Sequence, residues 1–165
     1  MFLIWIVAAF AMLTGAYALL GAEAAPAPLA PSAMALAANM SAYRQAVVAF
    51  ARANPSFAGS VPAASLAPYL GATVANPMWR NYVQPNTGYA GSLVVVYAAS
   101  ASASASAAAA AAVDGIERIA QGSALAGVAL GANLVSPGNP AVPLPAALAN
   151  AIPNGMPVWM AQAYD

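Results

Sequence analysis

The hydrophobic positions between residues 33 and 54 fall on one face of a helix. Those positions, spaced four, three, four and three residues apart, are Leu36, Met40, Tyr43, Val47 and Phe50. This spacing is typical of an amphipathic α-helix with one buried stripe. Asn54-Pro55 ends the pattern, because proline disfavours helix at the residue before it. We expect Tyr43, Val47 and Phe50 to face a sheet, although the same stripe could pack on another protein.

Apolar and β-branched runs further along the chain predict strands. The segments 78–83 and 92–97 are rich in aromatic and β-branched residues and are separated by a loop that contains Pro, Asn and Gly; they predict a hairpin. The segments 124–130 and 133–136 predict a second hairpin. The segment 158–160 predicts a terminal strand. Since these short strands do not alternate with helices, the pattern indicates an α+β domain with a small antiparallel sheet.

Short helices are expected around this sheet. Two turns are predicted over 63–70, after Pro62, and a further short helix over 144–151. Residues 98–112 form a low-complexity Ser/Ala tract. High alanine propensity favours a helix over 107–119, with Val113, Ile116 and Ile119 buried, whereas the lack of large side chains would equally suit a flexible loop.

The first 22 residues carry no charge and are almost entirely apolar. As a helix this segment would measure roughly 33 Å, about the thickness of a bilayer core. We therefore expect a transmembrane anchor over 1–22, with Trp5 and Tyr17 towards its two ends. A Pro-rich spacer over 23–32 and an α+β domain over 33–165 follow.

Two other interpretations of the N-terminal segment remain open. Ala22-Glu23-Ala24 has the A-x-A form of a signal-peptide cleavage site, although no Lys or Arg precedes the apolar core. A processed pilin would have an acidic residue near the start of the helix, and the first acidic residue here is Glu23. The mass of the mature protein separates an anchor, a pilin and a secreted binding module.

The composition removes most catalytic chemistry. The chain has no His and no Cys, four basic and four acidic residues, and a formal net charge of zero. No basic patch is available for nucleic acid, and neither imidazole nor thiolate is available as a base, nucleophile or metal ligand. Asp114 and Glu117 could do acid–base work, but a solubilising helix face explains them better. We expect no enzyme activity, no cofactor, no metal and no small-molecule ligand.

A few side chains are candidates for contact with a partner protein. The residues that we expect to face a partner are Arg44, Arg52, Trp79 and Tyr82. Trp79 and Tyr82 also suit the core and rim of a sheet.

Several stretches together resemble the PilM family of conjugative type IV thin-pilus systems, which is distinct from the actin-like proteins of that name. The stretches, in order, are Tyr43–Pro55, Gly59–Pro62, Trp79–Val83, Asn133–Pro137, Leu144-Pro145 and Ile152–Gly155. Their order and spacing carry the resemblance, which covers nearly the whole chain. The Ser/Ala tract at 98–112 departs from the family pattern.

The resemblance implies a bacterial inner-membrane protein with a single transmembrane helix and a periplasmic body. Its implied role is in the pilin transport apparatus or basal body of the thin pilus. Its implied partners are the membrane and other pilus biogenesis proteins of the inner membrane and periplasm, without nucleic acid. The alternatives are a pilin-like subunit of the fibre and an exported binding module. The family offers no catalytic residues, and it gives Arg44 a role in contact at the helix surface.

Overall fold

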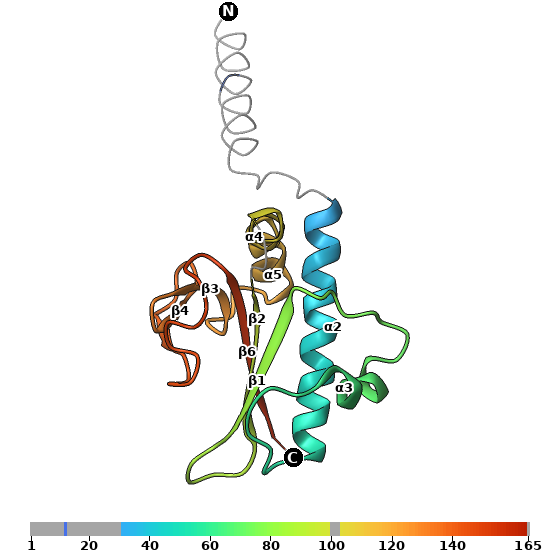
Figure 1. Ribbon diagram of the computed structural model, residues 1–165. Helices are drawn as coiled ribbons and strands as arrows, with labels where there is room; N and C mark the ends of the chain where they lie inside the picture. The colour runs from blue at the N-terminus through green and yellow to red at the C-terminus, as the bar shows by residue number, and fades with distance from the viewer. Residues whose placement is uncertain (1–11, 13–30, 100–102, 165) are drawn as a thin grey trace, which may run out of the picture.

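The computed structural model describes residues 12, 31–99 and 103–164, which form an α+β body (Figure 1). The helices are α2 (Pro31–Ala53), α3 (Ala63–Leu70), α4 (Ala103–Ala111) and α5 (Val113–Ile119). The strands are β1 (Trp79–Pro85), β2 (Ser92–Ala98), β3 (Ala126–Leu130), β4 (Asn133–Val135), β5 (Val142–Pro143) and β6 (Pro157–Ala163).

All six strands form one antiparallel sheet in the order β1-β2-β6-β3-β4-β5. The expected α+β class, both expected hairpins and the terminal strand are confirmed. The C-terminal strand is longer than expected and lies between the two hairpins, where it pairs with β2 on one side and β3 on the other. The last segment of the chain therefore joins two halves of the sheet that are far apart in sequence.

The long helix α2 lies along one face of the sheet, across β1, β2 and β6 (Figure 1). The expected stripe is its packed face: Met40, Tyr43, Val47 and Phe50 are buried, and Leu36 is partly buried against the same core. Phe50 also meets Phe57 and Tyr69 edge-on, with ring centroids 5.1 and 6.0 Å away. The helix stripe thus packs on its own domain, as expected.

The Ser/Ala tract is helical over its described part. Residues 103–111 form α4, which leads into α5. Ile116 is fully buried, and Val113 and Ile119 are partly buried. α5 packs beside α2 and against β3 and β6, so the expected buried face is correct, whereas the alternative of a flexible loop does not hold for residues 103–111.

Gly115 lets α5 approach α2 closely. A Cβ atom at this position would lie 2.9 Å from Ala37 Cβ and 3.3 Å from Ala33 O. In sequence, Gly115 reads only as a weak point in a helix. In the structure it supplies the smallest possible surface where two helices touch.

One predicted helix is absent from the structure, and one predicted helix begins earlier than expected. The expected helix over 144–151 is wrong: this segment is a series of turns, with Leu148 N–H and Ala149 N–H both donating to Pro145 O. Asn150 has a left-handed φ of 63°, which interrupts any helix there. Near the N-terminus of the domain, α2 begins at Pro31 and so includes the last two residues of the expected spacer over 23–32. Proline is tolerated there because it lies in the first helical turn.

The expected anchor over 1–22 lies outside the described residues apart from Met12, and so does most of the spacer. Within the described ranges, none of the helices combines the length and apolar character needed to cross a bilayer.

Replacing Phe50 by Ala should lower the free energy of unfolding by about 3–5 kcal/mol, because a ring that is 8% exposed and touches two other rings leaves a cavity. Urea unfolding of the full chain measures this loss. Val74, which is 84% exposed, provides the control: Val74→Ala should change stability by no more than about 0.5 kcal/mol. A Phe50→Ala loss below about 1 kcal/mol would contradict the packing of this face.

Gly115→Ala should destabilise the fold by about 1–3 kcal/mol even though alanine is the better helix former, because the new methyl group overpacks against α2. Thermal unfolding monitored by circular dichroism measures the change. Adding Ala37→Gly should restore part of the lost stability, since it removes the nearest opposing atom. A gain in stability for Gly115→Ala alone would show that α2 and α5 are not in close contact.

Candidate functional site

Asparagine side chains fix α2 on the sheet at two places, and the first is Asn81 of β1. Asn81 is 4% exposed, and its amide is fully used. Its Nδ2 donates to Tyr43 Oη at 2.7 Å and to Val61 O at 3.1 Å, and its Oδ1 accepts from Val61 N–H at 2.6 Å. The hydrogen bonds of one side chain thereby hold α2, β1 and the start of the α3 segment together.

The second place is Asn39 of α2, whose Oδ1 accepts hydrogen bonds from Trp79 Nε1 and Asn76 N–H, both at 2.9 Å. Trp79, a candidate for partner contact, is 3% exposed. Its ring is therefore buried inside the domain, and its one side-chain donor, Nε1, is hydrogen-bonded there. Trp79 and Asn81 are alternate residues of β1 and share the face that α2 covers.

Tyr82 and Arg52, the other candidates apart from Arg44, lie in different places. Tyr82 alternates with Asn81 along β1, so it lies on the sheet face turned away from α2, where it is half-buried. Arg52 is exposed in the last turn of α2. The structure brings Arg52 near Arg44 but places Trp79 and Tyr82 elsewhere.

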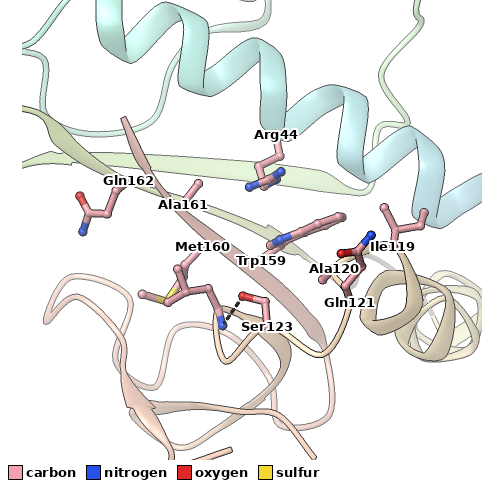
Figure 2. A pocket seen from close by; sticks show the side chains of 10 residues that line it. Arg44, Ile119, Ala120, Gln121, Ser123, Trp159, Met160, Ala161 and Gln162 are labelled. Atoms are coloured by element: carbon pink, nitrogen blue, oxygen red, sulfur yellow. Dashed lines mark hydrogen bonds between the residues drawn. The ribbon is translucent and has the colours of Figure 1, made fainter. Parts of the chain in front are cut away.

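A groove runs between α2 and β6, and Arg44 reaches into it (Figure 2). One part, of about 390 Å³, is lined by Arg44, by residues of the turn between α5 and β3, and by Trp159–Gln162. An adjoining part of about 260 Å³ is lined by Arg44, Gln45, Val48, Ala49, Arg52, Ala161 and Gln162. We call the two parts together the Arg44 groove. Arg44, Val48 and Arg52 are four residues apart, so one face of α2 forms its helical wall.

Arg44 is charged, half-buried and without an acceptor. Its guanidinium lies over the ring of Trp159, 4.4 Å from the carbon centre to the ring centroid. Its Nε is buried with no hydrogen-bond partner, and no acceptor among the described residues meets the rest of the group. Burial lowers the pKa of Arg44 from its usual value, since desolvation disfavours the charged form. An arginine in this state is suited to receive an acceptor from another molecule.

Other polar clusters offer less. A hollow of about 490 Å³ lies over Asn81, Tyr43 and Trp79, but their polar atoms are already hydrogen-bonded within the domain. Burial, followed by the charge of Asp114, raises the pKa of Glu117 on α5. Neither Asp114 nor Glu117 lines the Arg44 groove, and no acidic residue is among its lining residues. No group of three or more potential metal ligands occurs among the residues that the structure describes.

The β6 side of the groove could not be found from sequence. The sequence predicts a terminal strand only over 158–160, and nothing in it indicates that Trp159 lies under Arg44. The α2 side of the groove could be anticipated from the sequence, because the helical spacing places Arg44 and Arg52 off the buried stripe of α2.

The fold and groove define a small α+β protein with an open groove between its long helix and the C-terminal strand. The sequence model of the PilM family matches residues 7–160, so the chain belongs to this family. The resemblance noted in the sequence is thereby confirmed, and it supports a role in conjugative pilus biogenesis. No curated protein and no solved structure matches the chain.

Arg44→Met should raise the free energy of unfolding by about 1 kcal/mol. The thioether keeps contact with Trp159, while the change removes an unpaired donor of a kind that costs about 1–3 kcal/mol when buried. Urea unfolding measures the gain. Arg80→Met is the matched control, because Arg80 Nη1 donates to Pro77 O and Trp79 O and its loss should bring no gain. A lower stability of Arg44→Met would mean that Arg44 serves the fold.

Proposed function

We propose that this chain is a non-enzymatic component of the assembly apparatus of a conjugative type IV thin pilus. Membership of the PilM family carries this proposal. In it, residues 1–22 anchor the chain once in the bacterial inner membrane, and the α+β body lies in the periplasm. The uncharged apolar N-terminal segment supports the anchor, since its length matches a bilayer core.

The body acts by binding other pilus biogenesis proteins of the inner membrane and periplasm. The Arg44 groove supports this role, because it is open and holds the guanidinium of Arg44, which has no acceptor within the described residues. The absence of His and Cys from the sequence argues against most acid–base, nucleophilic and metal chemistry. Neither a cofactor nor a small-molecule ligand is part of the proposal.

Deleting the gene should abolish thin-pilus formation and pilus-dependent DNA transfer, and the full-length gene supplied in trans should restore both. Pilus counts by electron microscopy and transfer frequency are the measurements. Unchanged transfer in the deletion strain would contradict the proposal.

The same complemented strain tests the anchor and the two alternatives. Intact mass and membrane fractionation should give a full-length chain in the inner-membrane pellet. Loss of a few N-terminal residues, with the chain incorporated in the fibre, would favour a pilin-like subunit. Loss of about the first 24 residues would favour an exported binding module, since Ala22-Glu23-Ala24 has the form of a cleavage site.

A further inference from the structure

β6 has a free edge along the Arg44 groove. β2 pairs with β6 over residues 158–163, whereas β3 pairs with it only at Pro157, Val158 and Trp159. The last backbone hydrogen bond on the β3 side is from Met160 N–H to Leu125 O, at 2.7 Å. Among the residues that the structure describes, no strand or bridge continues the sheet beside residues 161–163.

The direction of the free backbone groups follows from the ladder. In an antiparallel sheet, alternate residues direct both N–H and C=O to the same neighbouring strand. Since Met160 N–H points to the β3 side, Met160 C=O and both backbone groups of Gln162 point there too. Leu125 N–H donates to Ser123 Oγ at 3.2 Å and does not return a bond to Met160 C=O. The chain before β3 thus turns away and leaves these groups facing the groove.

The free edge and the unpaired cation belong to one surface. Trp159 carries the guanidinium of Arg44 on the α2 side of the sheet, and Ala161, two residues on, has its side chain on that same side. Figure 2 shows Arg44 reaching from α2 towards Trp159 while Ala161 and Gln162 follow along β6. A strand added beside β6 would therefore place the side chain opposite Ala161 next to Arg44.

We propose that the Arg44 groove binds an extended segment of a partner protein as an additional strand on β6, with an Asp or Glu side chain of that segment paired to Arg44. Strand addition supplies main-chain hydrogen bonds, and one side-chain pocket supplies specificity. The carboxylate gives the guanidinium the acceptor that it lacks within the domain. Trp159 holds the guanidinium in place, and Arg52 adds a second positive charge along the same wall.

The chemistry of the groove favours an acidic peptide over other occupants. The fork-shaped guanidinium of Arg44 matches a planar carboxylate, whereas phosphate-rich ligands need more positive charge than Arg44 and Arg52 supply. The short side chain of Ala161 leaves space above β6, and Ile119, Leu125 and Met160 provide apolar walls for neighbouring side chains. The partner is therefore an apolar extended segment with one carboxylate. This inference deepens the proposed function and rests on it only for the statement that the partner is a pilus biogenesis protein.

The test is an NMR titration of the full-length, ¹⁵N-labelled chain in a mild non-ionic detergent. The probes are the peptide acetyl-Thr-Val-Glu-Val-Thr-amide and the same peptide with Gln in place of Glu. The Glu peptide should shift both the Gln162 backbone amide and the Arg44 side-chain Nε–H signal. It should bind at least about tenfold more tightly than the Gln peptide, because a hydrogen bond from a guanidinium to a carboxylate is stronger than one to a neutral amide.

Three variants separate the two parts of the site. Arg44→Met should remove the preference for Glu over Gln. Gln162→Pro should abolish binding of both peptides, because it removes an edge donor at a position where proline is tolerated. Arg80→Met, which changes an arginine outside the groove, should bind like the parent chain.

Equal affinity for the Glu and Gln peptides would overturn the role of Arg44. Shifts at Arg44 without shifts at Gln162 would overturn strand addition. Self-association of the free chain that Arg44→Met abolishes and the Glu peptide inhibits would make the occupant a second copy and overturn the partner. These measurements use purified protein, so their failure is distinct from failure of the proposed function, which pilus formation and DNA transfer decide.

Discussion

The packing of α2 across β1, β2 and β6 is the interaction on which the rest of this structure depends. The apolar stripe of the helix supplies the burial, and two asparagines supply the alignment. Asn39 Oδ1 on the helix accepts a hydrogen bond from the indole N–H of Trp79, and Asn81 Nδ2 on β1 donates one to the hydroxyl of Tyr43. A shift of the helix by one turn would break the hydrogen bonds of both asparagines, and the cost would be larger at Asn81, which is buried, than at Asn39, which is partly exposed. The helix is thereby fixed in one position relative to the strands.

The small residues of the chain have specific tasks within that arrangement. Gly115 permits close contact between α5 and α2, and Gly127 does the same in the sheet, where a Cβ atom would collide with Val135 O. In a chain with so many alanines, large side chains are few, and close approach of the backbone is the means by which interior space is filled. Glycine at these two positions, inside α5 and β3, therefore serves packing and not a turn.

The scarcity of charge makes Arg44 informative. The whole chain has four arginines. One of them, Arg44, is half-buried and has no carboxylate partner among the described residues. Removing water from a guanidinium is costly unless an acceptor replaces it. The stability expected from Arg44→Met and the acceptor proposed for the groove are two consequences of the same uncompensated charge. The open edge of β6 lies beside it because the turn before β3 leaves the strand at Met160.

The sequence by itself determined the local elements. The 3.6-residue period of α2, the β-branched runs of both hairpins and the two turns of α3 depend on neighbouring residues, and each was placed within a few residues. Local pattern failed at 144–151, where the predicted helix is a series of turns and Asn150 has a left-handed conformation. The position of β6 between the hairpins, the need for glycine at position 115 and the stacking of Arg44 on Trp159 were decided only by the tertiary structure. The physical reason is that periodicity reports which side of an element is buried, whereas these features depend on which distant element covers that side.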